Sequence, residues 1–305
     1  RQGIEVRFAE DDSAGAMAKL IDGKTTAIFC ESIGNPAGNI VDLEALADMA
    51  HAHGVPLIVV STVPTAALLK PLEWGADVIV SSLTKYMGGH GNSRGGRIVD
   101  GGEFPWADSP EKFHMLNEPE ESYHGGVYTE ALGAAAYAGR ARTVALRNTG
   151  SAISPMNAFL ILQGMQTLPL RMERHCDNAL AVAGYLKGHP KVSWVNFAGL
   201  PDSPYYDLAQ KYTGGKPSAL LTFGIKGGFD AGVKFYDALQ MFLRLVNIGD
   251  VKSLAAHPAS TTHRQLSPEE LESAGVTPDM IRLCIGIEDI EDIIADLEQA
   301  LDAAG

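Results

Sequence analysis

Three short apolar runs, at residues 24–30, 56–60 and 77–80, constrain the fold of this chain more than any other feature. None of them alternates apolar with polar residues, so each predicts a strand that is buried on both faces. Helical segments separate them, one with Asp42 as its candidate N-cap and a shorter one over residues 65–72. Such strands, joined by helices, predict an α/β fold with a mostly parallel sheet covered on both faces.

Ligands of such a sheet bind beyond the carboxyl ends of its strands. The loops that follow Cys30, Val60 and Val80 should therefore converge on one site. A further strand is expected at residues 95–100. By contrast, residues 103–128 show no clear period, and we expect them to run as an excursion over the surface.

The second part of the chain has a different pattern. Ser154 followed by Pro155 is typical of a helix start, and the domain boundary is expected shortly after that helix. We therefore expect a large domain over residues 1–167 and a smaller α+β domain over residues 168–305. The elements expected in the second domain are strands at 192–195, 219–223 and 281–285, helices at 230–243 and at the chain's end, and a capping box at 267–270.

The chemistry of the sequence is concentrated in one stretch, SLTKYMGGHG at residues 82–91. It follows the third apolar run, so two hydroxyls, a lysine and a glycine cluster come together at a strand end. Hydroxyls and backbone N–H groups can hold a phosphate, and a lysine walled by apolar neighbours becomes a usable amine nucleophile. This combination suits a lysine that forms a Schiff base with pyridoxal phosphate (PLP). A surface lysine followed by a glycine-rich loop fits the bare pattern equally well.

Composition excludes several other classes of protein. The chain carries 24 basic against 37 acidic side chains, a net charge of −13, so neither nucleic acid nor an anionic membrane is an expected partner. No apolar run approaches the length of a membrane span. The three cysteines are widely spaced and odd in number, which favours a reducing cytoplasm over a disulfide framework. The nine histidines show no metal-ligand spacing, so we expect no metal.

The lysine stretch closely resembles the lysine motif of the Cys/Met-metabolism PLP-dependent enzymes, and within them that of the O-acetylhomoserine sulfhydrylases. The resemblance covers essentially the whole chain. It implies an aspartate-aminotransferase-like (fold type I) large domain and an amino-acid substrate. The implied reaction is a γ-replacement on O-acetylhomoserine, in which sulfide or a thiol displaces acetate to give homocysteine or methionine. The further motifs that carry the resemblance are ESIGNP at 31–36, SYHG at 122–125, LRMERH at 170–175, HPASTTH at 257–263 and IRL at 281–283.

The resemblance also implies a role for individual residues. Lys85 would bind PLP covalently and then move protons on the substrate. Ser82 and Thr84 would hold the cofactor phosphate, and Asn35 would bond the oxygen on the cofactor ring. Arg282, flanked by apolar residues, would bind the substrate α-carboxylate; on sequence alone, a structural ion pair would satisfy a buried arginine equally. The loop that contains Asn247 would line the substrate side.

One position departs from the family pattern. Where the family carries Asp-Asn at the end of the second apolar run, this chain has Val60 and Ser61. That aspartate pairs with the pyridine nitrogen and keeps the cofactor ring an electron sink, which valine cannot do. Members of the family also carry a further segment ahead of the point that matches Arg1.

These two features keep a second hypothesis open, that of a catalytically impaired homologue or a partial chain with a role in assembly. Among enzymes, cystathionine γ-synthase and methionine γ-lyase are the alternatives to the sulfhydrylase. The resemblance further implies a homo-oligomer, a tetramer built from dimers.

Overall fold

The computed structural model describes residues 3–262, 264–273 and 275–305. Two parts of the sequence predictions, Arg1 and His263 of the substrate-side motif, lie outside the described residues.

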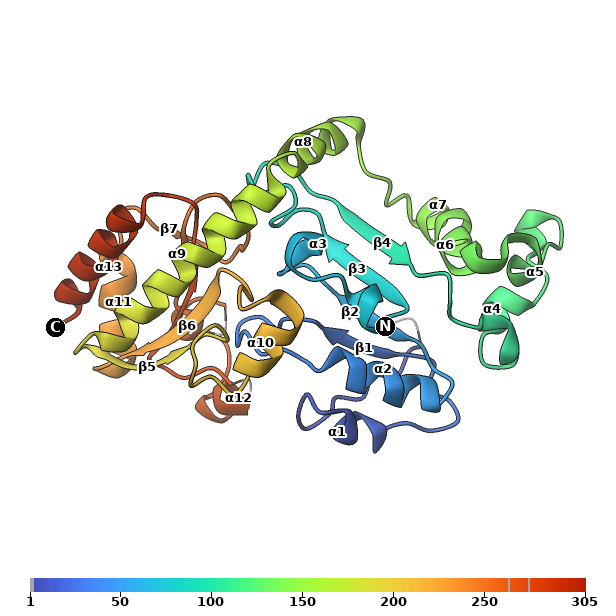
Figure 1. Ribbon diagram of the computed structural model, residues 1–305, viewed down its shortest axis with the longest axis horizontal. Helices are drawn as coiled ribbons and strands as arrows, with labels where there is room; N and C mark the ends of the chain where they lie inside the picture. Colours follow the sequence, from blue (N-terminus) through green and yellow to red (C-terminus); the bar gives the residue numbers. More distant parts are fainter. Residues whose placement is uncertain (1–2, 263, 274) are drawn as a thin grey trace.

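A four-stranded sheet in the order β1-β2-β3-β4 forms the first half of the molecule (Figure 1). The first three strands are parallel and β4 is antiparallel to β3. The prediction of a mostly parallel α/β sheet is therefore confirmed, and the carboxyl ends of the parallel strands lie along one edge. The bounds are β1 (Ile28–Glu31), β2 (Leu57–Val60), β3 (Val78–Ser82) and β4 (Gly96–Asp100).

The helix after β1 begins where the sequence predicts it. The Asp42 carboxylate accepts the backbone N–H of Ala45 at 3.4 Å, and α2 (Leu43–Ala52) follows. Leu43 and Leu46 lie on its buried face, so the helix packs on the sheet. The helix expected over residues 65–72 is divided: α3 (Thr65–Leu68) is followed by a 3-10 turn at Pro71–Trp74. A further short helix, α1 (Ala14–Ala18), precedes the sheet.

The segment over residues 103–128 has a small core of its own, and the prediction of a plain surface excursion is wrong in this respect. Phe104, Trp106 and Phe113 are buried against one another, with ring centroids 4.7 to 5.6 Å apart. Aromatic pairs of this kind need no sequence period. The helices of this segment, and those that follow it up to residue 149, lie at the end of the molecule remote from the C-terminal sheet (Figure 1). They are α4 (His114–Asn117), α5 (Tyr128–Leu132), α6 (Ala136–Arg140), a π-helical stretch (Ala141–Leu146) and α7 (Arg147–Thr149).

Two helices carry the chain from the first sheet to the second. The Ser154 hydroxyl caps α8 (Pro155–Met165), as predicted. The long helix α9 (Leu168–Gly188) then runs diagonally to the C-terminal part (Figure 1). The boundary between residues 167 and 168 stays a prediction, although the two sheets lie on either side of it in sequence.

The second sheet has five strands in the order β5-β6-β9-β8-β7, and it is antiparallel apart from the β7–β8 pair. Helices and antiparallel strands together agree with the predicted α+β composition. Two short strands at its edge are not indicated by the sequence. The strands are β5 (Val192–Asn196), β6 (Leu220–Ile225), β7 (Leu243–Arg244), β8 (Leu254–Ala256) and β9 (Met280–Cys284).

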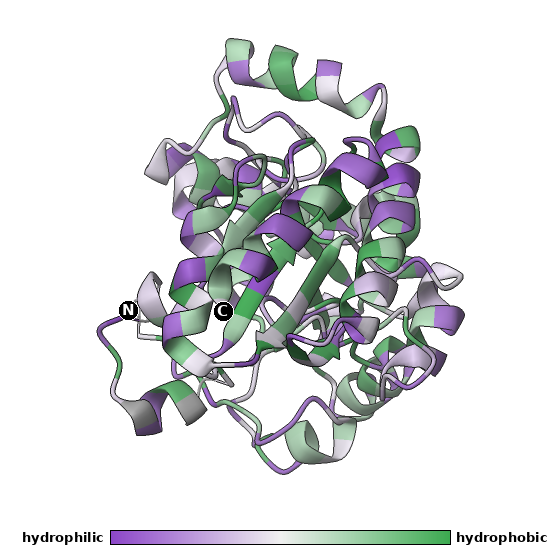
Figure 2. Ribbon diagram, turned by 90° about the vertical axis from the view of Figure 1, so that its left-hand side faces the viewer, coloured by the Kyte–Doolittle hydropathy of each residue, from purple (hydrophilic) through white to green (hydrophobic). Residues whose placement is uncertain are grey.

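Helices cover this second sheet, and the predicted capping box is present. The Ser267 hydroxyl accepts the Glu270 N–H at 3.3 Å, while the Glu270 carboxylate accepts the Ser267 N–H at 2.8 Å. Figure 2 shows apolar strands at the centre, behind helices whose outer faces are polar. The helices are α10 (Tyr206–Thr213), α11 (Gly228–Ala238), α12 (Pro268–Ser273) and α13 (Ile290–Ala304).

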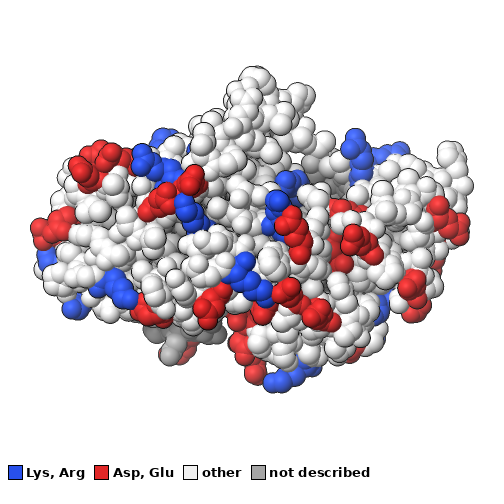
Figure 3. All heavy atoms as spheres, viewed as in Figure 1, with Lys and Arg blue, Asp and Glu red and all other residues white. Residues whose placement is uncertain are grey.

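The surface agrees with the charge balance of the sequence. On the face drawn in Figure 3, acidic and basic side chains are interspersed. Of the helices in the described part of the chain, none combines the length and apolar character that crossing a bilayer requires. All three cysteines are buried and free.

His175 on α9 is fully buried between the two sheets, and it makes stability depend on pH. Its Nδ1 donates to the Ile285 carbonyl oxygen at 2.7 Å, while Nε2 is buried without a partner among the described residues. Burial is the main reason that the pKa of the imidazole is lowered to about 4; the hydrogen bond to Ile285 opposes the shift, the charge of Arg171 adds to it, and the charge of Asp250 opposes it. Because the unfolded chain binds this proton more readily than the native state, stability is lost as pH falls from about 6.5 to about 4.

We therefore predict that the free energy of unfolding falls by about 3 kcal/mol across this range on account of His175 alone. Urea unfolding of the wild type and of His175→Asn between pH 7 and pH 4 measures it, since asparagine keeps a donor near the Nδ1 position. The same substitution at exposed His53 is the control and should retain the full fall. An equal pH dependence in His175→Asn and wild type would show that the buried imidazole is not its source.

Candidate functional site

The loop after β3 has a fixed conformation that directs the lysine. The Gly88 N–H donates to the Leu83 carbonyl at 2.9 Å, and the Gly89 N–H donates to the Lys85 carbonyl at 2.7 Å. Gly89 has a φ of +72°, and a Cβ there would lie 2.4 Å from the Arg171 guanidinium. Only glycine fits this position, so the glycine cluster in the sequence has a packing cause.

Lys85 lies half-buried at the carboxyl edge of the first sheet, as predicted. Its Nζ donates to the side-chain oxygen of Asn247, 162 positions later in the chain. Burial lowers the pKa of the amine, and the positive charges of Arg282 and Arg94 lower it further. The fraction of neutral, nucleophilic amine near neutral pH is therefore larger than in an exposed lysine.

A pocket of about 640 Å³ opens beside this amine, a volume typical of small-ligand sites. Its walls come from the lysine loop, the loop before β4, the start of α8 and the loop after β7. Polar and cationic groups dominate the lining, so an anionic ligand suits it. The lining residues are Thr84, Lys85, Gly91, Asn92, Ser93, Arg94, Asn157, Val246 and Asn247.

Arg282 on β9 is only 7% exposed. Its Nη2 donates to the carbonyl oxygens of Val246 at 2.8 Å and Asn247 at 3.2 Å, and its Nη1 donates to the Asn35 side-chain oxygen at 3.2 Å. Within the described residues its Nε is buried without a partner, and the structural ion pair that the sequence left open does not form. A buried guanidinium without a counter-charge favours binding of an anion.

Asn35 reaches this point from the first sheet. It lies in the turn after β1, which the Gly34 N–H closes by donating to the Asn39 carbonyl at 2.9 Å. The Asn35 N–H donates to the Glu31 carboxylate at 3.2 Å. Hydrogen bonds therefore connect four of the predicted residues, Lys85, Asn247, Arg282 and Asn35, from both sheets.

The two predicted phosphate-binding hydroxyls occupy different places. Thr84 lines the pocket, but its hydroxyl donates to the Gly95 carbonyl at 3.3 Å and accepts the Gly95 N–H at 3.1 Å. Ser82 ends β3 and is not among the lining residues; its N–H donates to the Thr62 hydroxyl at 3.0 Å. Thr84 therefore closes the loop before β4, and it could bind a phosphate only by releasing Gly95.

Val60 ends β2, between Glu31 of β1 and Val80 of β3. Its carbonyl accepts the Ser32 N–H at 3.0 Å. The next residue, Ser61, has a buried hydroxyl without a partner among the described residues. The central strand end therefore presents an apolar side chain and a neutral hydroxyl, and it carries no carboxylate.

The sequence did not single out Arg94, Asn92 or Asn157 as members of the site. A signal existed for Arg94, because it follows the glycine cluster in a loop that must return beside the lysine. The Tyr86 hydroxyl, 3.1 Å from the buried Cys284 sulfur, has no such signal, since the two residues come from different sheets. No group of metal-ligating side chains occurs in residues 3–262, 264–273 and 275–305.

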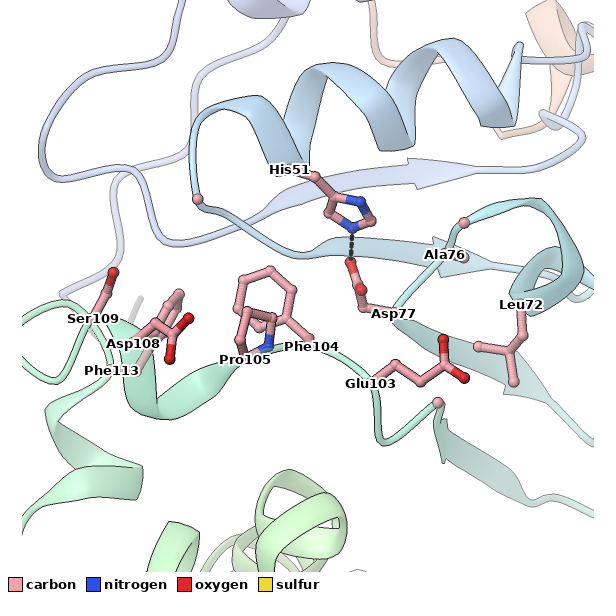
Figure 4. A pocket seen from close by; sticks show the side chains of 13 residues that line it. His51, Leu72, Ala76, Asp77, Glu103, Phe104, Pro105, Asp108, Ser109 and Phe113 are labelled. Carbon is pink, nitrogen blue, oxygen red and sulfur yellow. Dashed lines mark hydrogen bonds and ion pairs between the residues drawn. The ribbon is translucent and has the colours of Figure 1, made fainter.

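A second hollow, of about 680 Å³, lies at the opposite, amino-terminal ends of β2 and β3 (Figure 4). Its inner wall carries His51, whose Nε2 lies 2.9 Å from the Asp77 carboxylate. Asp77 also accepts the Leu57 N–H at 2.7 Å, so it fixes the start of β2. Glu103, Asp108 and two phenylalanines complete a wall that contains no lysine. This hollow therefore lacks the groups gathered around Lys85.

Comparison with known proteins gives a family match over nearly the whole chain. A family model described as Cys/Met metabolism PLP-dependent enzyme matches residues 1–302. The chain is 50% identical to O-acetyl-L-homoserine sulfhydrylase 1 of Thermus thermophilus, over 99% of this chain and 72% of that protein. It is 48% identical to homocysteine synthase of Schizosaccharomyces pombe, over 100% of this chain and 71% of that protein.

A solved structure from Campylobacter jejuni, described as an O-acetylhomoserine (thiol)-lyase with a pyridoxyl-lysine, superposes with a TM-score of 0.89. The two chains are 40% identical, and the match covers 95% of this chain and 69% of the other. The predicted fold type I architecture is therefore confirmed.

The residues present fit PLP at its point of attachment. The Lys85 amine is half-buried, has a lowered pKa and opens into a polar, cationic pocket of suitable size, as a phosphorylated aldehyde requires. Val60 departs from the pattern that the resemblance implies, because an apolar side chain stands where a carboxylate is expected. On the family match and the shared fold together, the chain belongs to the Cys/Met metabolism family of PLP-dependent enzymes.

Proposed function

We propose that this protein replaces the acetoxy group of O-acetylhomoserine with sulfide or a thiol, giving homocysteine or methionine and acetate. In the reaction with sulfide the Cγ–O bond breaks, a Cγ–S bond forms, and acetate leaves as the sulfur loses its proton. The meeting of Lys85 and Arg282 at Asn247 is the observation that carries this proposal, because it sets a reactive amine beside a carboxylate site. The names of the similar proteins support the choice of substrate.

The cofactor, when bound, supplies an electron sink that makes the substrate Cα–H bond acidic. Lys85 would hold it, and its amine would then carry protons between substrate carbons. Burial and the neighbouring cations favour the neutral amine, which is the form that accepts a proton. Asn247 accepts a hydrogen bond from Nζ and so orients the amine toward the pocket.

Arg282 would bind the substrate α-carboxylate through its guanidinium fork. Its bonds to Val246, Asn247 and Asn35 fix the plane of the group before substrate arrives. Asn35 would in turn bond the oxygen of the cofactor ring. Of the two strand-end hydroxyls, Thr84 lines the pocket and would hold the phosphate after releasing Gly95, while a phosphate-binding role for Ser82 stays a prediction.

Product analysis with cofactor mapping tests the proposed function. Incubated with PLP, O-acetylhomoserine and sulfide, the protein should form homocysteine and acetate in equal amounts, and Lys85→Met should form neither. Borohydride reduction followed by peptide mapping should place a pyridoxyl group on Lys85. Recovery of unmodified Lys85 from cofactor-loaded protein would refute its assignment, and cystathionine formed from cysteine in place of sulfide would reassign the reaction to cystathionine γ-synthesis.

A conservative change at Arg282 tests its role as the carboxylate site. Arg282→Lys keeps the charge but loses the fork, so the apparent affinity for amino-acid substrates should fall by roughly tenfold or more. Titration of the cofactor absorbance with O-acetylhomoserine measures it, with exposed Arg174→Lys as the control. Unchanged affinity in Arg282→Lys would leave this arginine a structural role only.

Val60 favours the second candidate, a catalytically impaired homologue. A carboxylate at this position would hold a proton on the ring nitrogen, whereas an apolar side chain favours its neutral form. Val60→Asp should therefore raise turnover at least about a hundredfold, or about 3 kcal/mol of barrier. Val60→Asn has the same shape as the aspartate variant and supplies polarity without charge, so its turnover should rise little.

Both variants should still bind PLP, and spectral titration with PLP checks that. A wild-type turnover equal to that of Val60→Asp would show that this protein does not need the charge. If neither the wild type nor Val60→Asp forms product while Lys85 takes up the cofactor, the impaired homologue is the correct description.

We infer that the protein assembles as a homo-oligomer, and the resemblance implies a tetramer built from dimers. Exposed apolar side chains along α8, such as those of Met156, Phe159 and Leu162, support association but do not fix the number of subunits. The three buried free thiols support a cytoplasmic location.

A further inference from the structure

Arg171, in the first turn of α9, is 5% exposed and binds no carboxylate of the described residues. Its guanidinium donates instead to three backbone carbonyls and a hydroxyl. Nη1 donates to Tyr86 at 2.8 Å, Nη2 to Gly164 at 2.8 Å and Met87 at 3.4 Å, and Nε to the Thr167 hydroxyl at 3.1 Å. Three oriented carbonyl dipoles and one hydroxyl therefore stabilise the buried charge.

The carbonyls that Arg171 binds are placed next to the reactive amine. Tyr86 and Met87 directly follow Lys85, and Gly164 lies in the last turn of α8. Hydrogen bonds from a charged donor are stronger than those between neutral groups. One side chain thus joins the lysine loop to α8 and to the start of α9.

The lysine loop packs closely against α8 and α9 around Arg171. A Cβ on Gly164 would lie 2.0 Å from the Gly88 carbonyl oxygen, and one on Gly89 would lie 2.4 Å from the guanidinium itself. The loop and the two helices are therefore in direct contact, and the guanidinium fills the space between them. A shorter or uncharged side chain would leave the Tyr86 and Met87 carbonyls buried without donors.

Uncharged groups make further hydrogen bonds to this loop. On the side away from Arg171, the Val251 N–H donates to the Gly89 carbonyl at 2.8 Å. The Tyr86 hydroxyl lies 3.1 Å from the Cys284 sulfur, which also accepts the Gly249 N–H at 3.2 Å. Among the described residues, Arg171 is thus the charged anchor of the loop.

We propose that Arg171 is a positioning residue for Lys85: by binding the Tyr86 and Met87 carbonyls, it holds the lysine loop in the conformation that keeps the amine half-buried at Asn247. Arg171 does not touch the pocket and performs no chemistry. The inference rests on the proposed function only in taking Lys85 as the reactive amine.

Loss of this anchor changes the surroundings of the amine in a definite direction. Lys85 faces Arg282 and Cys284 of β9 and Arg94 of the loop before β4, and burial is the largest cause of its lowered pKa. Arg171 faces His175 on its own helix, with Asp250 near that imidazole. A loosened loop exposes Nζ to water, so its pKa should rise toward the ordinary lysine value.

Two measurements on the cofactor-free protein test the proposal without substrate. Hydrogen exchange measures how fast the loop amides exchange in peptides spanning residues 83–91, with the amides of β6 (Leu220–Ile225) as the internal reference. The pH dependence of Lys85 acylation, read by mass spectrometry, reports the state of the amine. In Arg171→Met we expect loop exchange to be faster by about tenfold or more relative to β6, corresponding to loss of about 1.4 kcal/mol of local protection. The acylation midpoint should move to higher pH.

Two further variants separate position from charge and from general stability. Arg171→Lys keeps the charge but loses the planar fork, so it should show the same changes to a smaller extent. It also carries the test if Arg171→Met fails to fold. Arg174→Met, the same substitution on the exposed face of the helix, should change neither readout.

Exchange that accelerates equally in the loop and in β6, with an unmoved acylation midpoint, would make Arg171 a general stabiliser and overturn the proposal. A midpoint that moves in Arg171→Met but not in Arg171→Lys, with unchanged loop exchange, would overturn it in favour of a direct charge effect. Because neither readout involves turnover, failure of the proposed reaction would leave this result intact.

Discussion

The site depends on the hydrogen bonds that the buried guanidinium of Arg282 donates. It is attached to the second sheet, yet it binds Asn35 from the first sheet and the carbonyls on both sides of the Val246–Asn247 bond. Asn247 then accepts the Lys85 amine. A buried positive charge has to be surrounded by oxygen atoms, and this requirement draws loops from distant parts of the chain together. Among the described residues its Nε group has no hydrogen-bond partner, which supports the proposal that this guanidinium binds an anion.

A second buried arginine, Arg171, acts on the same amine through the backbone of the lysine loop. Arg171 binds the backbone of the lysine loop, whereas Arg282 binds the loop that receives the lysine side chain. Neither has a carboxylate partner among the described residues. Arg282 beside the amine and Arg94 in the pocket lining give a site suited to anions, and both charges favour the neutral form of Lys85. At Val60 the same site lacks the one negative charge that would complement a protonated cofactor ring.

Much of this arrangement could be predicted from the sequence, because its signals are local. The unalternating apolar runs located the parallel strands, and the polar residues after them placed Lys85 at the strand ends. Asn247 was expected only as lining, since its bond to Lys85 joins loops 162 positions apart. The neighbouring strands β7 and β8 are too short to leave a pattern, and Phe104 and Trp106 pack as a pair without a helical or strand period. Arg171 lies on a helix whose spacing indicates burial but not what the guanidinium binds.

A crystal structure of the PLP-loaded protein with an O-acetylhomoserine analogue that lacks the α-amino group, and so cannot displace Lys85 from the cofactor, would test this account most directly. The account predicts a pyridoxyl group on Lys85 and the carboxylate of the analogue on the Arg282 guanidinium, with the Nε group no longer unpaired. An analogue carboxylate bound away from Arg282, or a cofactor attached elsewhere than Lys85, would contradict it.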